Sequence, residues 1–226
     1  YRYGTEFYGC SVKAGEWLFP KKIVNSSKFC VIHNAVDREK YRYSVQKREE
    51  IRGSMGITDQ FVIGHVGNFC YQKNHYFLLD VFEEVHKKDP NTVLLLAGDG
   101  VRFEKVRQIV AEKNLEDVVK LLGRRSDTDY LYQGMDAFLL PSNFEGLPIA
   151  GIEAQSAGLP CFMSDEITKE SKITEACYFI PLKSGAKYWA EEILDNRMER
   201  QSAEFLDNVE QYDLANQDQE LKSLIR

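Results

Sequence analysis

The sequence predicts an α/β protein in which a parallel sheet carries helices on both faces. From about residue 60 onward, short apolar runs alternate with amphipathic stretches of helical periodicity. The runs are almost continuously apolar, as "TVLLLA" at 92–97 illustrates, which is typical of strands buried on both sides. A repeated strand–helix alternation builds βαβ units, so the predicted fold is a Rossmann-like sheet flanked by helices.

The elements follow one another closely along the chain. Residues 60–67, "QFVIGHVG", are predicted to form the first buried strand. The stretch 74–88 places Leu78, Phe82 and Val85 on one face of a helix, which "DPN" then ends. The same alternation predicts a strand at 92–100, a helix at 102–114, a strand at 118–123, a helix at 126–134, and strands at 136–141, 159–164 and 177–181.

A polar, glycine-containing stretch, "SNFEGLPIAGIEAQSAGLPC", follows the strand predicted at 136–141. Residues 142–147 are expected to form a loop. Pro148 suits the first turn of a helix, where a missing N–H costs nothing. A helix is therefore expected to begin at this proline.

The two ends of the chain are organised differently. The N-terminal part is expected to contain a short helix at 12–22, a strand with a turn at 29–37, and a charged surface loop and helix at 38–56. The segment 184–226 is polar and helical, with Leu214, Leu221 and Ile225 on one stripe.

Composition excludes several classes of protein. The chain has 226 residues, is 43% hydrophobic and 28% charged, and carries a net charge of -6, which argues against a nucleic-acid partner. The five cysteines contain no CxxC pair and suit neither a disulfide framework nor a zinc site, and Cys161 and Cys177 are expected to be buried. The histidines are scattered, with His65 expected inside its strand, so no metal site is predicted. No signal peptide and no apolar run of membrane-spanning length appear.

Ligands of parallel α/β sheets bind beyond the carboxyl ends of the strands. The loop 142–148 lies at such an end, and the N–H groups of Gly146 and Leu147 at a helix N-terminus form a ready anion site. Glu145 and Glu153 are able to accept hydrogen bonds from hydroxyl groups, so phosphate plus polyol indicates a nucleotide sugar. The alternative makes Glu145 a solvated loop acid and Glu153 an ordinary helix residue, and spacing alone favours that alternative.

The other loops at this edge sharpen the interpretation. Lys73 stands just before a helix, where a cation is slightly unfavourable unless it meets an anion such as a diphosphate. "GDGVRF", from Gly98, lacks the third glycine of a dinucleotide fingerprint, so NAD is rejected and a tight turn suffices. Residues next to Gly123 are placed to lie along a base, and Asp127 is expected to cap the next helix.

At these residues the chain resembles the C-terminal, nucleotide-sugar-binding domain of glycosyltransferase family 4, whose members are retaining enzymes of the GT-B fold. The likeness rests on several motifs in the family's order. They are "AGEWLF", "VIHNAVD", "GHVGNFCYQKNH", "LLLAGDG" and "PSNFEGLPIAGIEAQSAGLPC", the last carrying the family's EG…E pattern.

The resemblance implies roles for individual residues. Glu145 would bind hydroxyls of the donor sugar, and Lys73, on the loop that begins at Gly67, would face the diphosphate from the opposite side to the N–H groups of Gly146 and Leu147. Glu153 would take the ribose hydroxyls. Gly123, Arg124 and their neighbours would lie along the base. Family members generally use no metal or other cofactor, because cationic groups and a helix N-terminus stabilise the leaving diphosphate.

Two departures from the family pattern are plain. Asn68 stands where the family usually has a diphosphate-binding arginine, which removes a charge and a bidentate fork. Weaker donor binding, compensation by Arg124 or Arg125, and a divergent donor remain open at this point. The second departure is the first GT-B domain, which carries most of the acceptor site and is represented only by residues 1 to about 25.

The expected organisation is therefore four-part: a remnant of the N-terminal domain (1–25), an interdomain connection (26–58), the nucleotide-sugar-binding domain (59–211) and a C-terminal helix (212–226). The expected function is the donor half of a retaining hexosyltransferase that uses a UDP- or GDP-sugar and a glycan or lipid-linked acceptor in bacterial polysaccharide or capsule synthesis. The fragment alone is expected to be inactive, and the whole enzyme to be cytoplasmic, at the inner face of the membrane. Alternatives are a non-catalytic nucleotide-sugar-binding module and a GT-B-like sugar-nucleotide epimerase.

Overall fold

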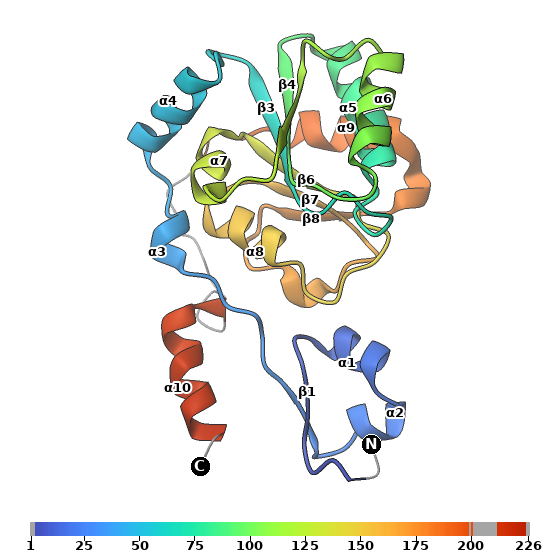
Figure 1. Cartoon of the computed structure of the whole chain (residues 1–226), viewed down its shortest axis with the longest axis vertical. Helices are drawn as coiled ribbons and strands as arrows, with labels where there is room; N and C mark the ends of the chain where they lie inside the picture. Colours follow the sequence, from blue (N-terminus) through green and yellow to red (C-terminus); the bar gives the residue numbers. More distant parts are fainter. Residues whose placement is uncertain (1–2, 199, 201–211, 225–226) are drawn as a thin grey trace.

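The computed structural model describes residues 3–198, 200 and 212–224, and its main body is a six-stranded parallel sheet with helices on both faces (Figure 1). The strand order is β5-β4-β3-β6-β7-β8, which confirms the predicted fold class. The strands are β3 (Phe61–Val66), β4 (Thr92–Ala97), β5 (Val119–Gly123), β6 (Ala137–Leu140), β7 (Cys161–Ser164) and β8 (Cys177–Ile180). The flanking helices are α4 (Val45–Ser54), α5 (His75–Lys88), α6 (Phe103–Glu112), α7 (Thr128–Gly134), α8 (Ile149–Ser156) and α9 (Gly185–Asp195).

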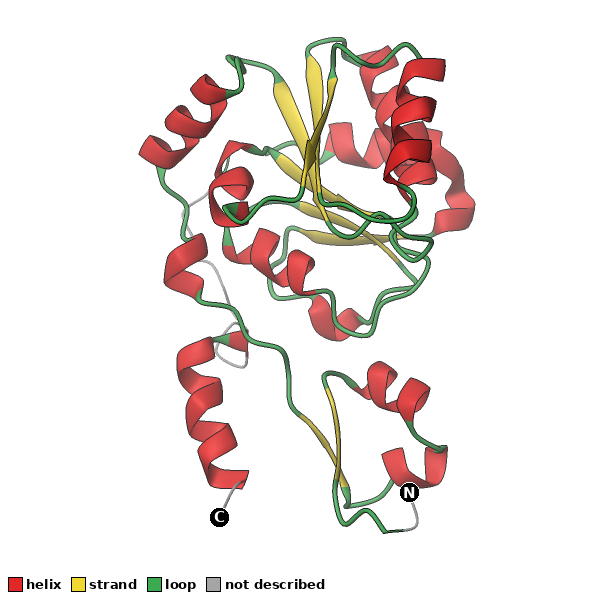
Figure 2. Cartoon of the chain, viewed as in Figure 1, coloured by secondary structure: helices red, strands yellow, loops and turns green. Residues whose placement is uncertain are grey.

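Each strand supplies side chains to two separate cores because successive residues point to opposite faces. In β3, Val62 belongs to one core and Ile63 to the other. The Val62 face is covered by α4, α7 and α8, and the Ile63 face by α5, α6 and α9 (Figure 2). Burial on both sides explains why the strands are almost continuously apolar and could be located from the sequence.

The N-terminal part forms a small separate unit below the main sheet (Figure 1). The stretch predicted as one helix at 12–22 is two, α1 (Val12–Leu18) and α2 (Lys21–Val24), because Pro20 interrupts it. The strand expected within 29–37 is β2 (Phe29–Val31), which pairs in parallel with β1 (Phe7–Gly9). Sequence analysis missed β1, since three residues are too few to show periodicity.

The charged stretch 38–56 contains α3 (Arg38–Tyr41) and α4, as a loop-and-helix prediction requires. It is less superficial than expected, because α4 buries Ile51 and Arg52. The helix predicted to begin at Pro148 begins one residue later, at Ile149. Pro148 is the N-cap of this helix, α8, and has φ -78°. A fixed φ of this size fits the N-cap as well as the first turn.

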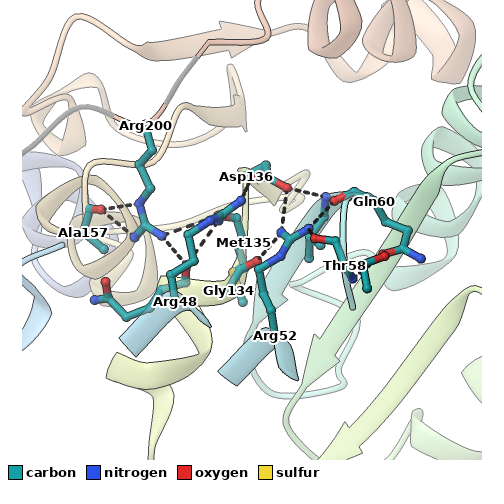
Figure 3. A network of polar contacts seen from close by, with 11 residues as sticks. Arg48, Arg52, Thr58, Gln60, Gly134, Met135, Asp136, Ala157 and Arg200 are labelled. Atoms are coloured by element: carbon teal, nitrogen blue, oxygen red, sulfur yellow. Dashed lines mark hydrogen bonds and ion pairs between the residues drawn. The ribbon is translucent and has the colours of Figure 1, made fainter. Parts of the chain in front are cut away.

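Three arginines converge at the amino end of β6, around Asp136 (Figure 3). Arg48 and Arg52 contact the two oxygens of its carboxylate at 2.5 and 3.1 Å, and both also donate to carbonyls at the end of α7. Arg200 donates to the Ala157 carbonyl at the end of α8, and burial lowers its pKa to about 9. Carbonyls at helix C-termini carry partial negative charge, so they stabilise the cations that Asp136 does not neutralise.

The C-terminal helix α10 (Leu214–Leu224) lies along the segment that leads from β2 to α3, where the Leu214 N–H donates to the Val36 carbonyl at 3.2 Å (Figure 1). Leu214 and Leu221 of the predicted apolar stripe are exposed, at 53% and 38%, and Ile225 lies outside the described residues. The stripe resembles the C-terminal helix of the family, which packs back on the N-terminal domain, and such packing of this chain stays a prediction. The polar segment 201–211 of the predicted helical tail also lies outside the described residues.

Candidate functional site

The strand order creates a crevice at one place along the carboxyl edge of the sheet. β3 and β6 are neighbours, yet the chain leaves β3 towards β4 on one side and leaves β6 towards β7 on the other. The loops after β3 and β6 therefore separate, and such switch points are where open α/β sheets bind ligands. Both loops singled out from the sequence, 67–73 and 142–148, flank this point.

Lys73 and Glu145 meet across the crevice. The Lys73 ammonium lies 2.6 Å from Oε1 of Glu145, joining the β3 loop to the β6 loop. Only 15% of the Lys73 side chain and 7% of the Glu145 side chain are exposed. An ion pair this deeply buried gives up hydration on both charges, so it is weak evidence for stability and better evidence for a site.

Two residues that sequence analysis did not select hold Glu145 in place. Gln72 donates from its side-chain amide to Oε2 at 2.9 Å, and the Ser142 hydroxyl donates to Oε1 at 3.0 Å. The two loops are also joined through Asn143, whose backbone N–H donates to the Gln72 carbonyl at 2.8 Å. Gln72 and Ser142 lie one and three positions from the predicted pair, but nothing in the sequence indicated their direction.

Glycines in the neighbouring loops let the backbones approach closely. A Cβ on Gly98, which has φ +141°, would lie 1.9 Å from the Gly67 carbonyl oxygen, and one on Gly100, with φ +151°, would lie 2.2 Å from Oδ1 of Asn68. Only glycine adopts these conformations readily. The glycines of "AGDG" therefore make a tight turn that supports the β3 loop, as the rejection of a dinucleotide fingerprint anticipated.

Two further predicted site residues, Asn68 and Arg124, line a cleft of about 410 Å³ together with Gly98, Asp99 and Gly100, which were not predicted to bind the donor. Arg125 is already paired, because its guanidinium makes two hydrogen bonds to the Asp127 carboxylate, at 2.8 and 2.6 Å. Asp127 stands at the N-cap of α7, as predicted, but its carboxylate accepts from Arg125 rather than from the helix. Of the two arginines considered as compensation for Asn68, Arg124 is the one beside it.

The loop of Gly146 and Leu147 lies against the N-terminal unit. The Ser11 hydroxyl donates to the Gly146 carbonyl at 2.9 Å, and the Trp17 ring contacts that of Phe144 at an angle of 49°, with centroids 4.9 Å apart. Burial raises the pKa of the Cys10 thiol, an effect that the N–H of Leu147 partly offsets. The predicted anion-binding loop therefore packs against residues of the N-terminal unit.

Glu153 lies on α8 and is bonded by different residues from those that hold the Lys73–Glu145 pair. Its oxygens accept hydrogen bonds from Tyr41 at 2.5 Å and from Tyr132 at 2.9 Å. Neither tyrosine was selected from the sequence. Gly123, at the end of β5, has φ +62° and begins the loop that carries Arg124.

His65 and His75 form a buried layer beneath the β3 loop, with ring centroids 4.8 Å apart. His65 is fully buried, as predicted, and its Nδ1 donates to the Leu139 carbonyl at 2.8 Å. Because a carbonyl only accepts, Nδ1 carries the proton. Burial, followed by the neighbouring His75, lowers the pKa of His65. Burial, followed by the charge of Lys73, lowers the pKa of His75 to about 4. Both rings are therefore neutral near pH 7 and add no charge beneath Lys73.

Cys161 and Cys177 are buried as expected, and the structure places both thiols in the core. Among the described residues, no group of three or more histidine, cysteine, aspartate or glutamate side chains is arranged to hold a metal ion. Within the same part of the chain, no helix has the length and apolar character needed to cross a membrane.

Comparison with known families decides the assignment. The family described as "Glycosyl transferases group 1" matches residues 47–193, about two thirds of the chain. The chain belongs to this family. Its matched segment contains Lys73, Glu145 and Glu153, so the site lies inside the family domain, while the N-terminal unit lies outside it.

Two bacterial relatives illustrate the match. EpsF of Bacillus subtilis (strain 168) is 34% identical over 167 residues, covering 74% of this chain and 44% of the relative. An Escherichia coli enzyme named UDP-Gal:alpha-D-GlcNAc-diphosphoundecaprenol alpha-1,3-galactosyltransferase is 33% identical over 146 residues, covering 63% of this chain and 38% of the relative. The chain thus spans less than half the length of these relatives. Both relatives are bacterial and are named as glycosyltransferases, EpsF as a putative one, in agreement with the resemblance.

A solved structure shows the same fold. Anabaena HepE, crystallised with UDP and glucose, superposes with a TM-score of 0.82 at 18% identity, covering 99% of this chain and 64% of that chain. The resemblance to the GT-B fold is therefore confirmed for the described part of the chain. The predicted roles of the individual site residues, and the four-part division of the chain, stay predictions.

Proposed function

We propose that this chain is the donor-binding part of a retaining glycosyltransferase, which binds a UDP- or GDP-sugar and transfers the sugar to a glycan or lipid-linked acceptor in polysaccharide synthesis. The observation that carries the proposal is the buried Lys73–Glu145 pair at the switch point of the sheet. It joins a cation suited to phosphate and a carboxylate suited to sugar hydroxyls within one crevice.

The two residues would contact different parts of the donor, Lys73 the diphosphate and Glu145 the sugar. An ammonium group has three donors, and Lys73 uses one on Glu145, which leaves two for diphosphate oxygens. Negative charge grows on the leaving diphosphate as the sugar–phosphate bond breaks, so a fixed cation at this point stabilises the transition state. Glu145 accepts from Lys73 and Ser142 on Oε1 and from Gln72 on Oε2, which leaves one lone-pair site, on Oε2, for a hydroxyl of the sugar.

UDP is the nucleotide to test first. The E. coli relative is named for UDP-Gal, and the HepE structure contains UDP and glucose. GDP remains the second choice, since the residues beside the expected base position, Gly123 and Arg124, contain no feature that selects uracil.

The proposal extends to the whole enzyme of which this chain resembles a part. The acceptor would bind mostly to a first GT-B domain, and the enzyme would work in the cytoplasm at the inner face of the membrane. It would use no cofactor or metal, because Lys73 and the N-terminal end of α8 supply the positive potential. The 226-residue chain alone would bind donor without transferring sugar.

Calorimetric titration of the chain with UDP, GDP and ADP at low salt tests the proposal. We expect saturable binding of one nucleotide. Lys73→Ala should raise the dissociation constant tenfold or more, which corresponds to a loss of at least about 1.4 kcal/mol of binding free energy. Lys87→Ala is the matched control, because Lys87 lies at the far end of the helix that Lys73 precedes and pairs with the carboxylates of Glu83 and Glu84 on the same helix. Equal affinities in both variants would contradict the role of Lys73.

One observation favours a second candidate, a non-catalytic nucleotide-sugar-binding module. Asn68 lacks the charge that the family usually places beside the diphosphate. An assay of donor hydrolysis by the whole protein separates the two candidates. Turnover supports the transferase, and donor binding without any turnover supports the module.

A further inference from the structure

Glu153 has no basic partner among the described residues, although its carboxylate is only partly exposed. Its two oxygens are instead bonded by two tyrosine hydroxyls that come from different elements. Tyr41 of α3 donates to Oε1 at 2.5 Å, and Tyr132 of α7 donates to Oε2 at 2.9 Å. One donor on each oxygen fixes both the position and the rotation of the carboxylate.

The two tyrosines are themselves held rigidly. Tyr41 is 7% exposed and Tyr132 is fully buried, and their rings meet edge to face with centroids 5.8 Å apart. Gln133, the residue after Tyr132, donates to the Tyr41 carbonyl at 3.1 Å and accepts from the Ser44 N–H at 3.0 Å. The side chain of Gln133 on α7 thus holds the backbone of the segment that carries Tyr41, which suits a fixed support rather than a mobile one.

Both hydroxyls stay protonated in this environment. Burial, followed by the neighbouring Glu153 carboxylate, raises the pKa of Tyr41 and of Tyr132. A protonated phenol next to a carboxylate donates its single O–H to it. The Tyr132 hydroxyl also lies 3.2 Å from the Ala150 carbonyl, but the Glu153 oxygen is nearer, at 2.9 Å, and carries the larger negative charge.

We propose that Tyr41 and Tyr132 are positioning residues that aim the Glu153 carboxylate at the vicinal 2′- and 3′-hydroxyls of the donor's ribose. An ionised carboxylate offers about four lone-pair sites, and the tyrosines use one on each oxygen. One site on each oxygen remains, which matches two hydroxyls on adjacent carbons. This inference rests on the proposed function, and it makes the connection around α3 part of the discrimination between ribo- and deoxyribonucleotides.

The test compares UDP with 2′,3′-dideoxy-UDP, which has the same base and diphosphate but no ribose hydroxyls. We expect the wild-type chain to bind UDP about tenfold more tightly than the dideoxy ligand. Tyr41→Phe should reduce that ratio about threefold or more while leaving the affinity for dideoxy-UDP unchanged. Glu153→Gln should abolish most of the ratio, and adding Tyr41→Phe to it should change nothing further, because Tyr41 acts only through Glu153.

Tyr130→Phe is the matched control, since it removes the same atom from α7 and the structure records no contact of Tyr130 with Glu153 in the described part of the chain. Its ring instead lies under the Lys47 ammonium. Unchanged UDP affinity there supports the proposal. If Tyr41→Phe weakens both ligands equally, or neither, the positioning role is overturned while the proposed function stands. If the wild-type chain binds neither UDP nor GDP, the proposed function falls and this role falls with it.

Discussion

Single residues carry the function proposed for this chain, and the sequence identified them more readily than their partners. Lys73 and Glu145 were selected on loop position and family motif, and the structure brings them to 2.6 Å. Gln72, Ser142 and Tyr41, which orient the two carboxylates, were not selected. A carboxylate's partners depend on how loops distant in sequence meet, and that information is not local to any motif.

The replacement of the family's arginine by Asn68 leads to a prediction at the residue scale. Asn68 and Arg124 line one cleft, and the Asn68 side chain lies directly over Gly100. Asn68→Arg should raise the affinity for UDP about tenfold, because it restores a bidentate cation beside the diphosphate. Arg124→Ala should lower the affinity in the wild-type background, and less so when Asn68→Arg is present. Calorimetry measures all four combinations.

Arg125→Ala is the control for Arg124→Ala, since Arg125 is already paired with Asp127. It should leave UDP binding close to that of the wild type. Identical losses for the two arginine variants, together with no gain from Asn68→Arg, would show that neither position faces the diphosphate.

At the scale of elements, the strands were the most predictable part of the molecule. All six sheet strands were located because burial on both faces makes them continuously apolar. The two short strands of the N-terminal unit were harder: β1 was missed, and it is held chiefly by its pairing with β2. The sequence also did not predict that arginines stabilise the C-terminal end of α7. They come from α4 and from position 200, and they reach its carbonyls only in the folded chain.

Asp136 is predicted to stabilise the junction of α4, α7 and β3. Its carboxylate contacts Arg48 and Arg52 and accepts from the Val62 N–H at 2.8 Å, and the Arg52 side chain is only 8% exposed. Asp136→Asn keeps the shape but leaves a buried cation without its counter-charge, so unfolding should become easier by about 3 kcal/mol. Urea unfolding followed by circular dichroism measures the change.

Glu104→Gln provides the comparison, because it breaks an ion pair with Arg107 in which both side chains are mostly exposed. Surface pairs of this kind contribute little, so its unfolding midpoint should match the wild type. An Asp136→Asn midpoint that also matches the wild type would mean that the carbonyls at the end of α7 satisfy the arginines without Asp136.

At the scale of the whole molecule, the sequence predicted one Rossmann-like body with short flanking pieces, and Figure 1 shows that arrangement. What it did not predict is how closely the N-terminal unit touches the candidate site. The contacts of Ser11 with Gly146 and of Trp17 with Phe144 join residues more than 120 positions apart. Contacts of this kind arise from the fold as a whole, and no local pattern of the sequence contains them.

Global stability should depend on pH through the buried histidines between β3 and α5. Their pKa values are lowered in the folded chain, that of His75 to about 4, whereas an unfolded histidine titrates near 6.5. Below about pH 6.5 the unfolded chain therefore binds more protons than the folded one, and stability falls as the pH decreases. Each histidine should contribute a slope of up to about 1.4 kcal/mol per pH unit between about pH 6 and pH 5, a window that lies above the usual range of the carboxyl groups.

Urea unfolding between about pH 7.5 and pH 5 measures this slope, and His75→Leu isolates one of its two sources. The variant fills the buried position with an apolar side chain of similar size and removes one of the two imidazole rings. The pH slope should therefore fall to about half, whatever the change in stability at neutral pH, because linkage depends only on the difference in bound protons. Parallel curves for the variant and the wild type would show that His75 gains no proton on unfolding in this range, which would contradict its neutral state in the fold.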